Sequence, residues 1–202
     1  MIPALALAAF AACGSPTPAP MTLEQMIAAD PIPLAKGAKW TYDVTYRRMD
    51  GGKETTRQAT WTTEVLDERS ANGIVAYRVR GWPTDLADLD ADTPNPTPTE
   101  RTILRHGNAF LYGASAEPTI DGAEGWFSWP VMDGQRICPS HEVTYCWVVE
   151  AIDGGYRLKY NTGPDEEVFD LAPGQGVSRF HYAHHGLTNE VEARLTSFSK
   201  GR

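Results

Sequence analysis

Hydrophobic and polar residues alternate along most of the chain after residue 33. The first such stretch places large side chains on one face, at Trp40, Tyr42, Val44 and Tyr46. Further strand-like segments follow at 59–65, 75–79, 101–105, 109–112, 143–149, 156–161, 166–171, 177–184 and 188–198. A period of two residues predicts strands with one buried face, and turn sequences such as Asp50-Gly51-Gly52-Lys53 predict hairpins between them. We therefore predict an all-β fold, an antiparallel meander that forms a curved sheet, an open barrel or a sandwich.

One short helix is predicted before the strands. Residues 22–25 have the Thr-x-x-Gln spacing of a capping box, so we expect a helix over residues 23–29. The pair Asp30-Pro31 ends this helix, because a residue before proline disfavours the helical conformation. Farther along, residues 83–99 are rich in Pro, Asp and Thr and predict a long exposed loop.

The N-terminus has the organisation of an export signal. Residues 1–12 form an uncharged apolar run that ends in small residues. The run is shorter than the roughly 20 residues that cross a bilayer, so it predicts a signal peptide. Residues 13–21 follow as a cysteine and a Pro-rich linker, and residues 22–202 as a single β domain.

The segment Phe10-Ala11-Ala12-Cys13 resembles the lipobox of bacterial lipoproteins. This resemblance implies cleavage before Cys13 and attachment of lipid, palmitate included, to the cysteine, which would anchor the protein to a membrane. Gly14, where an inner-membrane lipoprotein has Asp, implies the outer membrane, facing the periplasm or the cell surface. The alternatives are an ordinary secretory signal with an unrelated cysteine and a buried N-terminal segment.

Charge and cysteine content narrow the expected chemistry. The chain of 202 residues has a net charge of −8, which repels phosphate backbones, so no nucleic-acid partner is expected. Cys138 and Cys146 remain after Cys13 and predict a disulfide in an oxidising exported compartment. A metal site formed by these two cysteines and His141 is the alternative, but the spacing lacks the paired ligands of a zinc module.

Two segments with a central glycine suggest related halves. Residues 33–40 and 130–137 both read Pro, apolar, two residues, Gly, one residue, basic, apolar. They predict two β-meander halves that start near 33 and 130, with chance similarity as the alternative. Together with residues 172–177 and 195–198, these segments resemble a broad group of exported bacterial β-proteins and, loosely, the curved-sheet carriers LolA and LolB. The resemblance implies an unclosed barrel with a hydrophobic concave face and implies no catalytic residue.

Few residues carry recognisable chemistry. His181 and His185 would share one face of a continuous strand and are the candidate metal ligands, although exposed turn histidines are the favoured interpretation. Trp126 and Trp129 lie beside predicted loops, so we expect them to be partly exposed and to form a ligand or partner surface. With Trp147 they could also stack on sugars, although aromatic residues in strands more often form core. No catalytic motif is identified, and no cofactor is expected.

Three functions are consistent with these features. The preferred one is a non-catalytic accessory or structural lipoprotein, held to the membrane by its lipid, that binds a protein partner in a cell-envelope assembly. The alternative is a periplasmic carrier or chaperone that binds a lipid or other hydrophobic ligand on a concave β face. The third is a metal-dependent hydrolase that uses the late histidines.

Overall fold

The computed structural model describes residues 25, 29–50, 52–87, 96–138, 144–185 and 189–202. The predicted signal peptide, Cys13 and the linker lie outside these residues, as does most of the helix expected over residues 23–29. At the end of that segment the amide of Ala29 donates to the carbonyl of Gln25 (3.0 Å), which is one helical hydrogen bond.

No helix in the described part of the chain is long and apolar enough to cross a membrane.

Twelve strands and one short 3₁₀ helix make up the described domain. The first half contains β1 (Lys39–Asp50), β2 (Lys53–Ala71), β3 (Ile74–Arg80), η1 (Pro83–Leu86), β4 (Glu100–His106), β5 (Ala109–Gly113) and β6 (Glu124–Ser128). The second half contains β7 (Arg136–Ile137), β8 (Trp147–Ile152), β9 (Gly155–Asn161), β10 (Asp165–Ala172), β11 (Gly176–His184) and β12 (Asn189–Ser199). The predicted all-β antiparallel fold is confirmed.

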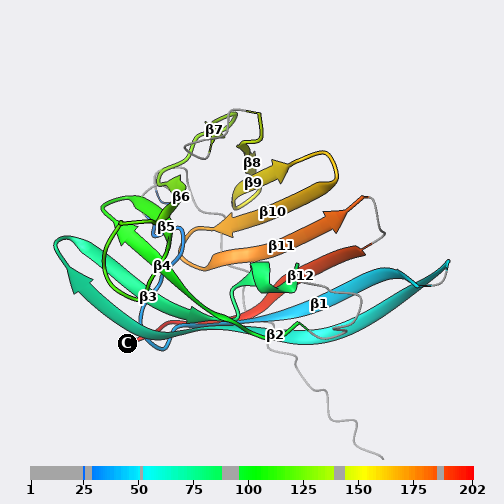
Figure 1. Cartoon of the computed structure of the whole chain (residues 1–202), viewed down its shortest axis with the longest axis horizontal. Coiled ribbons are helices and arrows are strands. Elements are labelled where there is room, and N and C mark those ends of the chain that lie inside the picture. Colours follow the sequence, from blue (N-terminus) through cyan, green and yellow to red (C-terminus); the bar gives the residue numbers. More distant parts are fainter. Residues whose placement is uncertain (1–24, 26–28, 51, 88–95, 139–143, 186–188) are drawn as a thin grey trace, which may run out of the picture.

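All twelve strands belong to one sheet, in the order β6-β5-β4-β3-β2-β1-β12-β11-β10-β9-β8-β7. Each half is an antiparallel meander, and the first and last strands of the chain pair with each other in the middle of the sheet. The sheet curls into a nearly closed barrel-like shape, in which β3–β6 rise on one side and β8–β10 on the other (Figure 1). Because of this curl, Trp126 of β6 packs against Phe169 of β10 with ring centroids 5.1 Å apart.

The inside of the curl is filled by the apolar faces of the strands. In β1 the residues Trp40, Tyr42 and Val44 are at most 1% exposed, whereas the intervening residues point outward, as their alternation predicts. The largest fully buried side chains are Trp40, Trp82, Trp126, Tyr42, Phe110, Phe169 and Phe180. Aromatic side chains of this size remove large apolar areas from water, so they contribute most of the stabilisation of this core.

The two glycine-centred segments form turns with the same hydrogen bonds. The amide of Gly37 donates to the carbonyl of Val65 (2.8 Å), and the amide of Gly134 donates to the carbonyl of Val149 (2.9 Å). Both glycines have positive φ angles, 83° and 74°, that favour glycine. Each turn leads directly into the first strand of a six-stranded half, β1 or β7. The relation between the complete halves stays a prediction.

Two local predictions are wrong. Residues 83–99 do not begin as an exposed loop, because Pro83–Leu86 forms η1. Leu86, at the end of η1, and Trp82, directly before it, are at most 1% exposed. These two apolar side chains pack inside the curl of the sheet. The Pro and Asp content of the segment does not reveal their burial. The strand expected over 143–149 begins at Trp147 and continues to Ile152, and Cys146, directly before it, is joined to Cys138 by a disulfide.

Candidate functional site: an aromatic cavity inside the sheet

A cavity of about 500 Å³ opens between η1, the strands β4–β6 and the strands β8–β11. We call it the aromatic cavity. Its lining residues are Thr84, Ala87, Arg101, Thr102, Tyr112, Gly113, Glu124, Gly125, Trp126, Trp147, Tyr160, Glu167 and Tyr182. The volume lies within the range of roughly 300–1,000 Å³ that is typical of small-molecule sites.

Two aromatic pairs form opposite walls of the aromatic cavity. Tyr112 of β5 stacks on Trp126 of β6 with ring centroids 5.4 Å apart. Trp147 of β8 lies 5.2 Å from Tyr160 of β9, and it also contacts the core residue Phe169 at 5.7 Å. The walls come from both halves of the sheet, so the cavity exists only because the sheet curls. Rings in this arrangement suit an apolar or aromatic group of a ligand.

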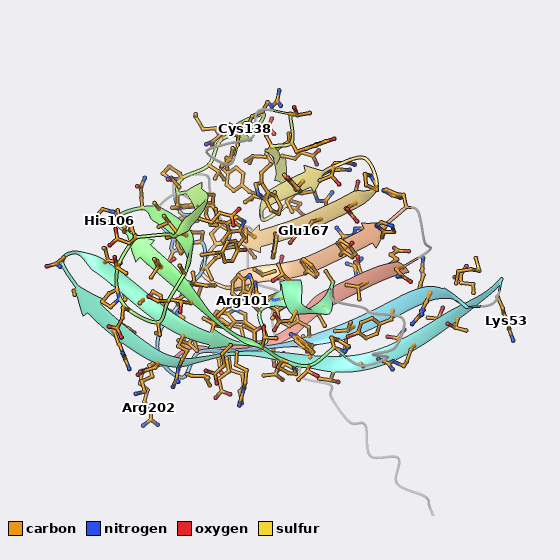
Figure 2. The ribbon with its side chains drawn as sticks, in the orientation of Figure 1. Lys53, Arg101, His106, Cys138, Glu167 and Arg202 are labelled. Carbon is orange, nitrogen blue, oxygen red and sulfur yellow. A yellow bond between two sulfur atoms is a disulfide. The ribbon has the colours of Figure 1, made fainter. Side chains whose placement is uncertain are left out.

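Glu167 of β10 is the carboxyl group most strongly affected by burial in the cavity. Burial raises its pKa from 4.5 to about 7, although the positive charge of Arg101 opposes this rise. Figure 2 shows Glu167 on β10 and Arg101 beside η1, so the two groups reach the cavity from different elements. A carboxyl group with this pKa is present in both the neutral and the charged form at neutral pH.

Arg101 is held in place by a buried aspartate. Asp85 of η1 is 1% exposed and accepts a hydrogen bond from the guanidinium of Arg101. The same carboxylate accepts bonds from the backbone amide (2.8 Å) and the hydroxyl (2.7 Å) of Thr99. Three donors on one carboxylate offset the cost of burying its charge. The guanidinium of Arg101 is therefore fixed at the cavity wall rather than free to turn outward.

Some polar atoms around the cavity have no hydrogen-bond partner in the described part of the chain. These buried atoms include the indole nitrogen of Trp126 and the hydroxyl of Thr84. An unsatisfied buried donor is costly, and such groups occur where a ligand or water supplies the missing partner. Burial also raises the pKa of Tyr112 far above its ordinary value, so this phenol is a hydrogen-bonding group and a poor nucleophile. The lining therefore suits binding better than covalent chemistry.

The tryptophans expected on the surface are buried. Trp126 is 1% exposed and Trp129 is 7% exposed, so the prediction that they are partly exposed is wrong. Trp129 packs edge-on against Tyr156 at 5.5 Å, inside the core cluster. Trp126 lies in the wall of the aromatic cavity, and Trp147, which is half-buried, presents its ring there as well. The curl of the sheet places β6 inward, a long-range effect that loop proximity does not predict.

The histidines expected as candidate metal ligands lie on the outer face of the second half. His181 stands between two carboxylates, with Nε2 3.2 Å from Glu190 and Nδ1 3.8 Å from Glu166. His185 is exposed, and its amide donates to the carbonyl of Pro164. Among the described residues no group of three or more His, Cys, Asp and Glu side chains is arranged to hold a metal ion.

His181 belongs to one of two rows of ionisable side chains that cross the strands. The first row contains Lys159, Glu166, His181, Glu190 and Arg47, and the second contains Arg157, Asp170, Arg179, Glu192 and Arg194. Each row crosses the sheet from β9 toward β12, and the first row continues to β1. Polar contacts between neighbouring strands stabilise their pairing, and His181 contacts Glu190 of β12 in this way, so its placement gives it a structural role.

The cysteines are joined as the sequence predicts. Cys138 and Cys146 form a disulfide that joins the end of β7 to the start of β8. A disulfide leaves neither sulfur as a thiolate, so the alternative metal site with His141 is excluded. His141 itself lies outside the described residues, as does Cys13, whose lipidation stays a prediction.

Glu167, Arg101 and Asp85 were not identified from the sequence. One signal for Glu167 was available, because it falls on the same face of β10 as Phe169 and Leu171, which are fully buried. An acidic residue on an apolar strand face indicates a buried carboxyl group. Asp85 offered no such signal, since it stands in a Pro- and Asp-rich segment that is typical of exposed loops.

Comparison with known proteins identifies fold neighbours only. No protein-family model matches the chain, and no curated protein matches it. One solved structure, from Bacteroides fragilis, is considered an exported protein with a YmcC-like fold. It is 12% identical to this chain and has a TM-score of 0.45, and the match covers 86% of this chain and 100% of the other chain. Another, from Parabacteroides distasonis, is considered a lipoprotein; it is 9% identical and has a TM-score of 0.47, covering 85% of this chain and 99% of its own. These likenesses carry no function to this chain, and the similarity to the LolA and LolB carriers stays a prediction.

Proposed function

We propose that the protein is a non-catalytic binding protein of the bacterial cell envelope that holds a small amphipathic ligand in the aromatic cavity. The observation that carries this proposal is the combination of aromatic walls with a half-buried carboxyl group, Glu167, and a fixed guanidinium, Arg101. The rings would contact the apolar part of the ligand. The two ionisable groups and the unsatisfied donors would orient its polar part.

The shape of the interior restricts what the ligand is. Among the described residues, buried core side chains pack around the aromatic cavity, which is a compact space and not a long groove for an acyl chain. The cavity instead suits a compact molecule that enters beside η1. The proposed role is thus a form of the carrier alternative, with a small amphipathic ligand in place of a lipid.

The proposed location depends on the lipobox at residues 10–13. A lipid on Cys13 would hold the domain at the membrane through the Pro-rich linker. We expect the substitution Cys13→Ser to move the protein from the membrane fraction to the soluble exported fraction. Unchanged membrane association of this variant would refute the lipid anchor and leave the cavity unaffected.

The binding role is tested by native mass spectrometry of the full protein purified from its own membranes in mild detergent. We expect wild type to carry a releasable small molecule in addition to its own lipid. The substitution Trp147→Ala removes one cavity wall and should lose this mass. Tyr145→Ala removes a nearby exposed aromatic residue that does not line the cavity and should retain it. An empty wild-type protein, or retention by Trp147→Ala, would contradict the proposal.

A second candidate role is that of an accessory subunit in an envelope assembly. The observation that favours it is the part of the β2 edge to which no strand of the described chain is bonded, where a strand of another protein could add to the sheet. The same native measurement distinguishes the two roles, because a subunit would be recovered with a defined protein partner.

A further inference from the structure

Strand β2 is much longer than the partner on its outer side. It runs from Lys53 to Ala71 and pairs with β1 along its first half. On the other side, β3 pairs only with the part of β2 from Glu64 to Ala71. The first half of β2 therefore has a sheet edge to which no strand of the described chain is bonded.

The register shows which backbone groups this edge presents. The hairpin between β1 and β2 closes on the pair Asp50 and Lys53, and such a closing pair exchanges hydrogen bonds. Every second residue of β2 from Lys53 therefore bonds to β1, and the residues between them point outward. The outward set consists of Glu54, Thr56, Gln58, Thr60 and Thr62. Consistent with this alternation, Val65 bonds to the turn that precedes β1, and Glu64 pairs with β3.

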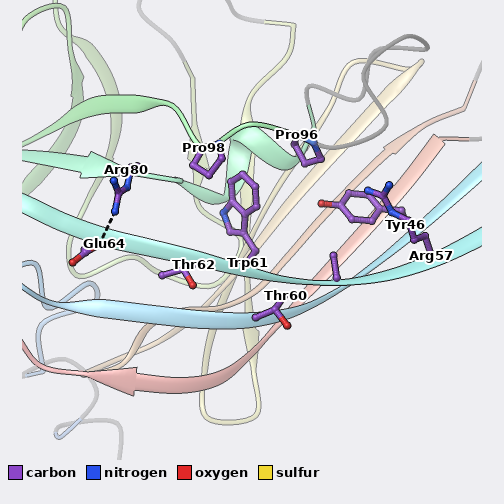
Figure 3. Close-up of a pocket in the computed structure, with 10 residues that line it drawn as sticks. Tyr46, Arg57, Thr60, Trp61, Thr62, Glu64, Arg80, Pro96 and Pro98 are labelled. Atoms are coloured by element: carbon purple, nitrogen blue, oxygen red, sulfur yellow. Dashed lines mark hydrogen bonds and ion pairs between the residues drawn. The ribbon is translucent and has the colours of Figure 1, made fainter.

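A pocket of about 610 Å³ lies along this edge, and we call it the edge pocket. It is lined by Tyr46, Arg57, Ala59, Thr60, Trp61, Thr62, Glu64, Arg80, Pro96 and Pro98. Figure 3 shows Pro96 and Pro98 facing Trp61 across the pocket, with Tyr46 and Arg57 at one end. A proline has no amide hydrogen, so this wall lies opposite the edge without donating to it.

The pocket is closed at one end and charged at the other. At the closed end, the carbonyl of Gly81 accepts from the indole of Trp61 (2.8 Å), and Glu64 is paired with Arg80 (3.0 Å). At the other end, the guanidinium of Arg57 lies 5.1 Å from the centre of the Tyr46 ring. Among the described residues no carboxylate pairs with Arg57, which is exposed. A ligand with a negative charge would complete this end.

We infer that the edge pocket binds an extended segment of a partner protein, which adds as a strand to β2 and places an acidic side chain on Arg57. The outward residues supply backbone donors and acceptors, which give affinity in this mode of recognition. Trp61 and the two prolines would hold one inward side chain of the segment, and Arg57 would select its charge. The inference deepens the role of accessory subunit and does not depend on any ligand in the aromatic cavity.

The wall of prolines favours a lone segment over a second copy of this chain. A second copy would bring its own β2 edge together with its own proline wall and a second Arg57. A single extended segment needs only the space between the edge and the wall. Within this edge, the stretch from Gln58 to Thr63 contains no charge and no proline, and such a stretch is open to strand addition.

The test uses the full chain as the target of a random library of 12-residue peptides displayed on phage. Enriched peptides are synthesised, and their affinity is measured by fluorescence anisotropy. Thr60→Pro removes one outward amide donor but no bond to β1, which is where a strand tolerates proline. Thr60→Ala is the matched control, because it removes the same hydroxyl and keeps the amide. Equal melting temperatures of the two variants would show that the fold is intact.

We expect the enriched peptides to contain acidic residues and to bind wild type and Thr60→Ala equally. Thr60→Pro should weaken binding about tenfold, which is the effect of one lost backbone hydrogen bond together with a steric conflict. Arg57→Gln should weaken it by a similar factor. Bound peptide should slow hydrogen exchange at the amides of Thr56, Gln58 and Thr60.

Several outcomes would overturn the inference. They are a library without enrichment, peptides that bind Thr60→Pro as tightly as Thr60→Ala, and exchange protection elsewhere on the molecule. Concentration-dependent self-association that protects the same amides would assign the edge to a second copy instead. None of these outcomes bears on the mass carried by the aromatic cavity, so failure here and failure of the small-ligand role are distinguishable.

Discussion

The half-buried carboxyl group of Glu167 makes the stability of the protein depend on pH in a calculable way. Its pKa is about 7 in the folded state and has an ordinary value of 4.5. At a pH between 4.5 and about 7, Glu167 keeps its proton in the folded protein, whereas the unfolded chain has released it. A carboxyl group with a raised pKa therefore contributes nothing unfavourable at low pH, and it lowers the free energy of unfolding as the pH rises from 4.5 through 7. The full loss corresponds to about 3 kcal/mol above pH 7, at 1.36 kcal/mol per pKa unit.

The substitution Glu167→Gln tests this reasoning directly. Glutamine is neutral at every pH, so the variant escapes the cost of ionising a buried group. The free energy of unfolding is measured by urea denaturation at pH 5, 6, 7 and 8 for both proteins. We expect the difference between variant and wild type to shift by about 2–3 kcal/mol in favour of the variant from pH 5 to pH 8. All other titrating groups cancel in this difference.

The matched control is Glu124→Gln, which changes a second carboxyl group of the cavity lining that is exposed. This control makes the same chemical change at an exposed position of the cavity and reports the effect of removing a carboxyl group there. A constant difference for Glu167→Gln would refute the reasoning, because it would mean that water or Arg101 compensates the charge completely. The cavity would then be a wet cleft rather than the partly apolar site proposed above.

Three further perturbations have defined expectations. Asp85→Ala leaves Arg101 without its buried partner and should lower the free energy of unfolding by about 3–4 kcal/mol in urea denaturation, and a loss below about 1 kcal/mol would contradict the role of this carboxylate. Arg179→Ala interrupts the second row at a mostly buried position and should lower the free energy of unfolding by about 1–3 kcal/mol. Arg47→Ala, at an exposed end of the first row, should lower it too little to measure. Equal effects of the two variants would argue against a stabilising role of the rows. Gly176→Ala places a Cβ against a buried indole at a φ of +94° and should lower the melting temperature by several degrees in calorimetry, so an unchanged melting temperature would show that the turn relaxes freely.

The parts of the fold that the sequence predicts are those set by neighbouring residues. The alternation from Trp40 to Tyr46 predicts β1 and its buried face, because a period of two depends only on the local backbone. Gly51 and Gly52 predict the first hairpin for the same reason. The pairing of β1 with β12, by contrast, joins residues more than a hundred positions apart, and no local pattern specifies it.

The candidate site could be predicted only in part, because it too depends on contacts between residues that are far apart in the sequence. The sequence singles out Trp126 and Trp147, but the partial exposure expected for Trp126 is wrong because the curl of the sheet turns β6 inward. Glu167 shows its burial in the sequence through its register with Phe169. Arg101 becomes a site residue only through Asp85, which η1 carries across the inside of the curl.

The connection between β3 and β4 takes part in both proposed sites. Its first part carries η1, from which Asp85 fixes Arg101 at the aromatic cavity, and its last part carries the prolines of the edge pocket. Asp85 also holds Thr99, which directly follows Pro98, so one buried carboxylate positions elements of both walls. We therefore expect Asp85→Ala to weaken both the small ligand and the peptide, whereas Thr60→Pro weakens the peptide alone. If Asp85→Ala affected only one of them, the two walls would be independent, and the connection would serve the fold rather than the coordination of the two sites.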